Sequence, residues 1–509
     1  MLSLRYMSER AEQNLRRTAE VSLLLAAAAS LILWLVRIYN VVSAATPYLL
    51  ATTGYEWEDL FSIWKFTQHQ AVYADPHRIP FAVSSYNWAF YYFYGSVANA
   101  WLHLLHLDAV SIATIGRLIS LIFTLITGGI FWLIWRDFRK AGLFANPRVA
   151  WAWILIATLS PLAGYWSFTV RPDAGALAFE AAGLYAILRC LRKQDDRLIF
   201  LAALLFYAAW AFKQSSVTLL AGSALALILL KRWRAFLTLS SIWWLLVMVT
   251  LFAGGPVYRE NVLFSQLHLP MQVSLGLTNA LRAECKNPSL WLCIVAVLSL
   301  SWRNFRTLAS RPAEAAVTVV VLFSLCFALV TSCKVGANDN YYIPAAWSAM
   351  LAFALAAERM HSRWVAEGLA VCSWLMTGAI ALSPTGYTFY YDFRSQDFTY
   401  NVATIVTEKL RHLPAPAFAI EPYANMPWVQ PAAPHFVVAD TYYYDRKAGV
   451  PVEDGGWENL AAEGYFGTLV FDQNYNPPPR MLRKYELVDE YKDEFVDLKF
   501  YRRIGANTS

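Results

Sequence analysis

The sequence carries little charge for its length. Only 15% of the 509 residues are charged, 58% are hydrophobic, and the mean hydropathy is +0.37. Soluble domains carry about 25% charged residues. A deficit of this size indicates that much of the protein is solvated by lipid, which tolerates apolar surface and penalises unsatisfied polar groups. The composition excludes an ordinary soluble enzyme.

Other absences narrow the class of protein further. The net charge is only +6, and the basic residues lie between apolar runs instead of forming one tract, so nothing supports nucleic-acid binding. The six cysteines include no CxxC pair and no zinc-ligand spacing. No internal repeat of the kind found in many transporters is visible.

What the sequence does contain is a series of apolar runs, from which we predict about eleven transmembrane helices. The runs are residues 21–36, 110–135, 149–170, 174–188, 198–212, 217–230, 236–253, 289–302, 315–331, 342–357 and 364–382. Arg16 and Arg17 precede the first run, which we interpret as an uncleaved span with its basic end in the cytoplasm.

One further run, residues 86–107, is long enough to cross but is rich in aromatic and polar residues. Counting it as a span would reverse the side of every later loop. If it does not cross, the short basic loops that contain Arg136, Arg189 and Lys231 face the cytoplasm, as the positive-inside rule requires. We therefore predict a membrane-lying or re-entrant helix in the outer interface.

With this topology the unusual polar segments gather on the outer side of the membrane. They are the first outer loop, residues 52–109, and the turns RPD (171–173), KQSS (213–216) and GANDNYY (336–342). The loops on the basic side contain nothing comparable. The sidedness predicts the face on which a functional site forms.

The hydropathy falls sharply after residue 382. This change divides the chain into a transmembrane domain, residues 1–382, and a tail, residues 383–509. The tail follows the last predicted span on the outer side. Runs of β-like composition occur at residues 418–421, 435–440, 468–472 and 498–503, between loops rich in Pro and Gly. We predict a small extracytoplasmic α/β domain.

Three acids stand together early in the first outer loop: Glu56, Glu58 and Asp59. Acidic residues at a helix end are common as solvated charges, and the residues alone favour that interpretation. A carboxylate at the membrane surface is also what a general base requires when the acceptor is a hydroxyl or an amine.

The RPD turn opens a predicted helix, and Pro with Asp in the first turn is an ordinary helix start. Glu180 lies two helical turns beyond Asp173, on nearly the same helix face and inside the apolar run. A carboxylate within the membrane is costly unless it faces a cavity or a partner. Structural use of this turn is the default interpretation, and Glu180 requires a cavity or a partner.

The KQSS turn begins with Lys213 and Gln214, between two runs of roughly 15 residues. Such runs are about 22 Å long if helical, against a hydrocarbon core of about 30 Å, so we expect a recessed turn. There Lys213 either snorkels or meets an anionic headgroup such as a lipid phosphate.

The late turn contains Asn338, Asp339, Asn340 and Tyr341. Its two amides flank the carboxylate and offer donors and acceptors suited to sugar hydroxyls. A polar helix cap is the structural alternative.

In combination, these segments resemble the C-type (GT-C) glycosyltransferases, in particular the bacterial branch related to protein O-mannosyltransferases and lipid A aminoarabinose transferases. The resemblance covers residues 21–382. It rests on VYADP (72–76), YNWAFYYFYG (86–95), SPLAGYWSFTVRPDAGALAFEAAGLYAILR (160–189), FKQSSVTLL (212–220) and GANDNYYIPAAW (336–347). The order and the sidedness of these motifs make it specific.

The resemblance implies a polyprenyl-phosphate-linked sugar donor, an active site on the outer face, and inversion at the sugar by direct attack of the acceptor. An acid of the first outer loop would act as base. The familiar Asp-Glu pair is not intact here, and Glu56 ranks first by its distance from Tyr73. Asp173 would match the second-loop acid, and Lys213 a contact to the donor phosphate.

Several further expectations follow from the resemblance. The donor-binding residues would be Arg171, Asp173, Lys213, Gln214, Asn338, Asp339, Asn340 and Tyr341. Some relatives use a divalent metal between the acids of the first and second loops and others need none, so both alternatives stay open. The location would be a bacterial inner membrane, with membrane lipids around the chain and a lipid, glycan or protein acceptor.

Two other classes of protein compete with this interpretation. A transporter or lipid-linked-sugar flippase would also combine many helices with rare intramembrane charges. The lack of repeats and the position of the polar segments at one face favour the transferase. A non-catalytic sugar- or lipid-binding assembly protein that uses the tail is the third alternative.

Overall fold

The computed structural model describes residues 9–43, 56–138, 147–287, 311–357, 405–420, 422–472, 475–492 and 497–505. The chain divides into two compact units. The helical unit comprises Met1–Tyr39, Leu118–Thr250 and Pro270–Tyr391, and the tail unit comprises Asn40–Arg117, Leu251–Leu269 and Asp392–Ser509. The sequence-based boundary between residues 382 and 383 lies outside the described residues.

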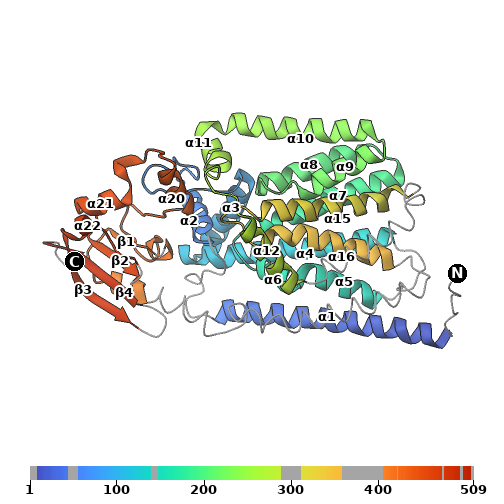
Figure 1. The fold of residues 1–509 in the computed structure, drawn as a ribbon, viewed down its shortest axis with the longest axis horizontal. Helices are drawn as coiled ribbons and strands as arrows, with labels where there is room; N and C mark the ends of the chain where they lie inside the picture. The colour runs from blue at the N-terminus through green and yellow to red at the C-terminus, as the bar shows by residue number, and fades with distance from the viewer. Residues whose placement is uncertain are drawn as a thin grey trace. The chain divides into compact units, whose positions relative to one another are not determined.

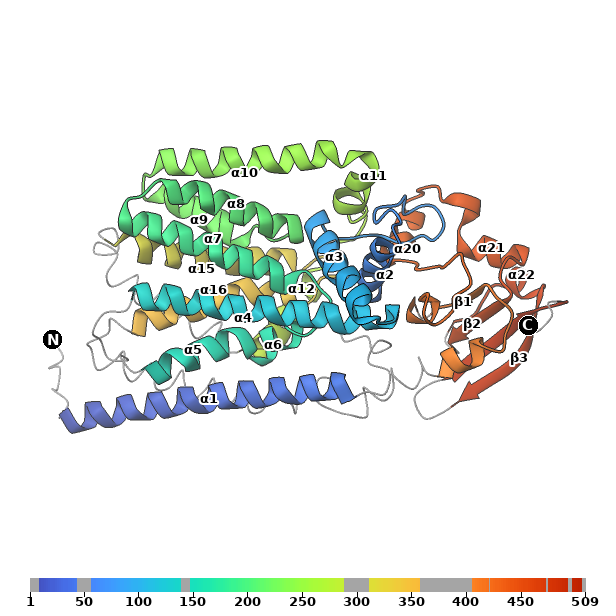
Figure 2. The ribbon, with the colours of Figure 1, turned by 180° about the vertical axis from the view of Figure 1, so that it is seen from behind.

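The helical unit is a bundle of apolar helices that run alongside one another, as both views show (Figures 1 and 2). The helices that lie wholly or largely in this unit are α1 (Glu9–Ser43), α4 (Ile112–Phe138), α5 (Pro147–Leu159), α6 (Pro161–Trp166), α7 (Asp173–Lys193), α8 (Arg197–Phe212), α9 (Thr218–Leu229), α10 (Trp233–Ala253), α12 (Val273–Lys286), α15 (Pro312–Thr331), η3 (Asp339–Tyr342) and α16 (Ile343–Ala357). The predicted helical class is confirmed.

Five described helices are long and apolar enough to cross a membrane: Glu20–Tyr39, Ala109–Phe138, Asp173–Lys193, Trp233–Ala253 and Pro312–Thr331. Shorter apolar helices are Val149–Leu159, Arg197–Phe212 and Thr218–Leu229. The total of about eleven spans and their sidedness stay predictions. The expected runs at residues 289–302 and 364–382 lie outside the described residues.

The structure corrects two expectations within the bundle. The run 149–170 is not one helix, because α5 ends at Leu159 and α6 begins at Pro161. Proline lacks the N–H of a continuing helix and clashes with the preceding turn, which explains the break. Helix α12 was not expected, because its sequence is amphipathic and half polar, unlike a membrane run.

Helices α7 and α8 pack closely because two glycines of α7 face phenylalanine rings of α8. A Cβ atom on Gly175 would lie 2.6 Å from the ring of Phe212, and one on Gly183 would lie 2.9 Å from the ring of Phe206. Any larger side chain would push the helices apart. The first turn of α7 therefore lies against the end of α8, which brings Asp173 to Lys213.

The tail unit combines helices of the first outer loop with a small sheet. Its elements are α2 (Glu56–Thr67), α3 (Trp88–Leu105), η1 (Ala109–Ser111), α11 (Gly255–Arg259), η2 (Glu260–Phe264), β1 (Ala417–Ala419), η4 (Pro422–Asn425), α20 (Asp440–Lys447), η5 (Glu453–Gly455), α21 (Trp457–Glu463), β2 (Thr468–Asp472), α22 (Pro479–Leu482), β3 (Tyr485–Lys492) and β4 (Asp497–Arg503). The strand order is β1-β2-β4-β3. Strand β1 is parallel to β2, whereas β4 is antiparallel to both of its neighbours.

The first outer loop and the tail share hydrophobic cores within this unit. Phe61 packs with Val406 and other tail residues, and Phe81 packs with Phe418. The expected strand at residues 435–440 is wrong, since this segment is not part of the sheet. Its backbone instead pairs with the first loop, where the Val437 N–H donates to the Pro80 carbonyl at 3.1 Å.

The edge strand β3 was missed by the sequence analysis. Its residues, YELVDEYK, include four charged side chains, and only Tyr485 is buried. An edge strand that faces water on one side resembles a polar loop in composition, and charged side chains also protect such edges from unwanted pairing.

Candidate functional site

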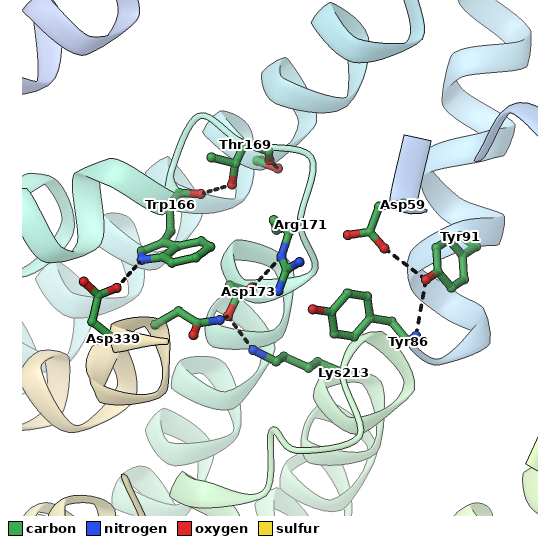
Figure 3. Close-up of polar contacts among 11 residues, drawn as sticks. Asp59, Tyr86, Tyr91, Trp166, Thr169, Arg171, Asp173, Lys213 and Asp339 are labelled. Carbon is green, nitrogen blue, oxygen red and sulfur yellow. Dashed lines mark hydrogen bonds and ion pairs between the residues drawn. The ribbon is translucent and has the colours of Figure 1, made fainter. Parts of the chain in front are cut away.

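The central polar contact of the helical unit joins Asp173 and Lys213. Asp173 opens α7 after Pro172, and Lys213 follows the last residue of α8, where the backbone becomes extended. The Lys213 Nζ donates to Asp173 Oδ1 at 2.6 Å, and both side chains are 7% exposed (Figure 3). A buried pair of this kind contributes little net stability to the fold. Removing one partner strongly destabilises the protein, because the other charge is left buried and unpaired.

Two further residues complete the surroundings of Asp173. Asn340 donates from Nδ2 to Asp173 Oδ1 at 2.9 Å, and Arg171 Nε lies 3.8 Å from Asp173 Oδ2. The Lys213 ammonium lies 5.0 Å from the centre of the Tyr341 ring. The structure therefore brings together the RPD, KQSS and GANDNYY turns, which lie far apart in sequence.

A second buried ion pair lies in the same unit. Lys286, the last residue of α12, donates to Asp339 Oδ2 at 2.5 Å, and Trp166 Nε1 donates to Asp339 Oδ1 at 3.0 Å (Figure 3 shows the tryptophan contact). The Arg171 guanidinium is centred 5.8 Å from the Trp166 ring, within the range of a cation–π contact. Trp166 thus contacts both Asp339 and Arg171, which borders Asp173.

The remaining residues of the predicted donor site differ in their contacts. Asn338 accepts from the Asp339 N–H at 2.8 Å and so caps the short helix η3, which is the structural alternative expected for this turn. Gln214 is half-buried beside Lys213.

Two small cavities flank Asp173, each with a volume of about 20 Å³. One has a largely apolar lining from helices α4 to α7, which includes Thr124, Thr158 and Leu177. The other is lined by Lys213 and Glu180 together with Asn340 and neighbouring residues. Each can hold about one water molecule and neither can hold a sugar.

The acids of the first outer loop all lie in the first turn of α2, where the helix dipole favours negative charge. All three are buried, with Glu56 at 0%, Glu58 at 7% and Asp59 at 1% exposure. Arg117 donates to Glu56 from Nε and from a terminal nitrogen, each at 3.3 Å. Tyr91 donates its hydroxyl to Asp59 Oδ1 at 3.0 Å (Figure 3). The solvated-charge interpretation is therefore wrong.

The far end of α2 anchors the loop that follows it. Lys65 Nζ donates to the Val72 carbonyl at 2.5 Å, and the Ser84 hydroxyl donates to the same oxygen at 2.7 Å. Burial lowers the pKa of Lys65 from 10.5 to about 8. These contacts hold the loop against the last turn of α2.

Three charged or polar partners were not predicted from the sequence: Arg117, Lys286 and Trp166. Arg117 had a visible signal, because a lone arginine inside an apolar run marks a buried partner. Lys286 had none, since it ends an amphipathic helix where lysine is common.

Comparisons with known proteins identify the fold. No protein-family model matches the sequence, and no curated protein sequence matches it. Among solved structures, ArnT from Cupriavidus metallidurans bound to undecaprenyl phosphate has a TM-score of 0.55 and 12% identity, covering 94% of this chain and 97% of that chain. ArnT in the apo state has a TM-score of 0.53 and 12% identity, covering 91% and 97%.

The oligosaccharyltransferase AglB from Archaeoglobus fulgidus, in complex with an inhibitory peptide and a dolichol-phosphate, matches with a TM-score of 0.49 and 12% identity, over 88% of this chain and 69% of that chain. The ArnT comparisons span nearly the full length of both proteins. The chain has the fold of ArnT, which confirms the fold that the sequence resemblance implied.

Proposed function

We propose that the protein is a membrane glycosyltransferase that moves a sugar from a polyprenyl-phosphate carrier to an acceptor, with inversion, on the extracytoplasmic side of a bacterial inner membrane. The main support is the buried cluster of Arg171, Asp173 and Lys213, in a fold shared with an ArnT structure that contains undecaprenyl phosphate. Two cations beside one carboxylate carry a net positive charge, which suits an anionic lipid headgroup.

Lys213 is the proposed contact to the donor phosphate. An ammonium group has three N–H donors, and Asp173 receives one of them in the observed contact. Arg171 supplies a second cation, while the amides and carboxylate at Asn340 and Asp339 suit sugar hydroxyls. Gln214, Asn338 and Tyr341 complete the proposed donor site.

A first-loop carboxylate is the proposed base, with Glu56 ranked first and Glu58 and Asp59 as alternatives. The acceptor's O–H or N–H gives its proton to this carboxylate, and the acceptor atom bonds to the anomeric carbon. The bond between that carbon and the phosphate oxygen breaks, and polyprenyl phosphate leaves with the electron pair. The Arg117 contacts orient Glu56 for this task, and the Tyr91 contact orients Asp59.

A divalent metal is not used in any step of this proposal. Within the ranges that the structure describes, no three His, Cys, Asp or Glu side chains come together as a metal site requires. Adding a chelator such as EDTA to a transfer assay tests the metal-dependent alternative, in which transfer would be lost and then restored by a divalent cation.

The donor contact is tested by Lys213→Gln in purified protein. We expect a weaker affinity for undecaprenyl phosphate, by about tenfold or more, because a charge-assisted contact is lost. Lys231→Gln, at an exposed turn, is the matched control. Unchanged affinity in a folded Lys213 variant would contradict the proposed phosphate contact.

The acceptor class is tested in cells. Mass spectrometry of lipids and envelope glycans from a deletion strain, beside its parent, should show the loss of one sugar modification. Identical profiles under conditions in which the parent expresses the protein would contradict the transferase proposal. A transporter or flippase, the alternative, would instead leave the donor chemically unchanged in a reconstituted assay.

A further inference from the structure

Glu180 is a buried carboxyl that the proposed reaction does not use. It lies in the middle of α7 and is fully buried. Its Oε1 accepts from the Leu219 N–H at 2.9 Å, at the start of α9, whose own N-cap residue Val217 makes no side-chain cap. Glu180 therefore caps the N-terminus of α9 from a neighbouring helix, which satisfies a donor that a helix leaves open.

The second carboxyl oxygen of Glu180 points to a different role. Oε2 has no hydrogen-bond partner within the described part of the chain, and Glu180 lines the cavity that also contains Lys213 and Asn340. Asp173 Oδ2 and Asn340 Oδ1 likewise have no hydrogen-bond partner there. Asp173 Oδ2 has the Arg171 guanidinium 3.8 Å away. Buried oxygens without donors are rare, so Glu180 Oε2 and Asn340 Oδ1 still need a donor. A proton on Glu180 Oε2 would supply one.

The charges around the cavity lead to the same conclusion. Lys213 and Asp173 line the cavity with one positive and one negative charge. Arg171, which borders Asp173 but does not line the cavity, adds a second positive charge. With neutral Glu180 the cluster keeps one positive charge, which a phosphodiester headgroup neutralises. With ionised Glu180 the cluster is neutral, and bound phosphate would leave a buried negative charge, which is strongly unfavourable.

Among the described helices packed against α7, no further charged side chain lines the cavity with Glu180. Helix α9 contains no charged residue, and α15 contains only Glu314, in its first turn. On α8 and the turn after it, Lys213 faces the cavity. On η3, Asp339 is already paired with Lys286.

We propose that Glu180 carries a proton and that its protonation controls how strongly the Lys213 cluster binds an anionic phosphate headgroup. This inference rests on the proposed phosphate contact of Lys213. It makes Glu180 a positioning residue, since it acts through Lys213 and need not touch the sugar. Low pH should favour headgroup binding, and high pH should weaken it.

The test measures binding of undecaprenyl phosphate methyl ester, a phosphodiester whose own charge is constant between about pH 5.5 and 9, to the full-length protein in nanodiscs. Wild-type affinity should fall about tenfold over this range, the effect of one like charge at about 10 Å and an effective dielectric constant of about 20. Glu180→Gln keeps the Oε1 acceptor and should bind at every pH as the wild type does at low pH. Glu314→Gln should keep the wild-type slope.

Equal slopes for the wild type and Glu180→Gln would overturn the inference while leaving the phosphate contact intact. Lys213→Gln separates the two claims. If this variant binds the headgroup as tightly as the wild type at every pH, the proposed phosphate contact itself is contradicted. Infrared spectroscopy gives an independent measurement that needs no ligand. The carbonyl band of a protonated buried carboxylic acid should be present in the wild type at pH 7 and absent in Glu180→Gln, and a wild type without the band would also overturn the inference.

Discussion

Removing one partner of the Asp173–Lys213 pair should destabilise the helical unit strongly. Lys213→Met leaves the Asp173 carboxylate buried, with Asn340 at 2.9 Å and Arg171 at 3.8 Å as its remaining contacts. Breaking a buried pair in this way costs about 3–5 kcal/mol. The remaining Arg171 charge places the expected loss near the lower end, at about 3 kcal/mol.

A double-mutant cycle isolates the pair itself. Asp173→Asn together with Lys213→Met removes both charges, so the double variant should lose about 1 kcal/mol and the coupling should be about 2 kcal/mol or more. Reversible unfolding in mixed micelles, followed by circular dichroism, gives the four free energies. Lys231→Met, at an exposed turn, should change stability by less than about 0.5 kcal/mol. Additive losses from the two single variants would refute the buried pair.

Three further predictions concern the tail unit and the topology. Glu56→Gln removes the charge that pairs with buried Arg117 and should destabilise the tail unit, so transfer is measured on the folded protein, where it should fall by about 10² to 10⁴ as expected for loss of a general base. A parental rate in this variant and in Glu58→Gln and Asp59→Asn would remove the proposed base. Because the folded pKa of Lys65 is about 8 against 10.5 unfolded, stability should rise with pH between these values, and Lys65→Met should abolish that rise in pH-dependent unfolding. A single cysteine at Gly455 should react with an impermeant thiol reagent from outside and one at Arg232 should not; the opposite labelling would reverse the proposed sidedness.

The sequence identified the turns that form the candidate site, but it did not identify the contacts between them. Asp173, Lys213 and Asn340 stood out because polar residues interrupt apolar runs, and the structure joins them directly. Their pairing depends on close packing of α7 and α8 at Gly175, which no hydropathy pattern encodes. The Lys286 contact to Asp339 depends likewise on the tertiary position of α12.

The tail shows a different limit of sequence reasoning. Runs of apolar and β-branched residues predicted β2 and β4 correctly, because buried strands carry that composition. Strand β3 is an exposed edge and was missed, whereas residues 435–440 have a strand-like composition but pair with the first loop. The composition of a segment indicates whether it is buried. Which segment it pairs with by backbone hydrogen bonds depends on the tertiary fold.

The central claim is that this protein transfers a sugar from a lipid-phosphate carrier. Its most direct test uses purified protein in proteoliposomes, a polyprenyl-phosphate donor carrying a radiolabelled sugar, and lipid extract from the parent strain as acceptor. We predict that the wild type releases free polyprenyl phosphate and moves the label to a new product, and that Lys213→Gln does so far more slowly at limiting donor. Donor that crosses the bilayer with its sugar still attached, and with no polyprenyl phosphate released, would contradict the account and support a flippase.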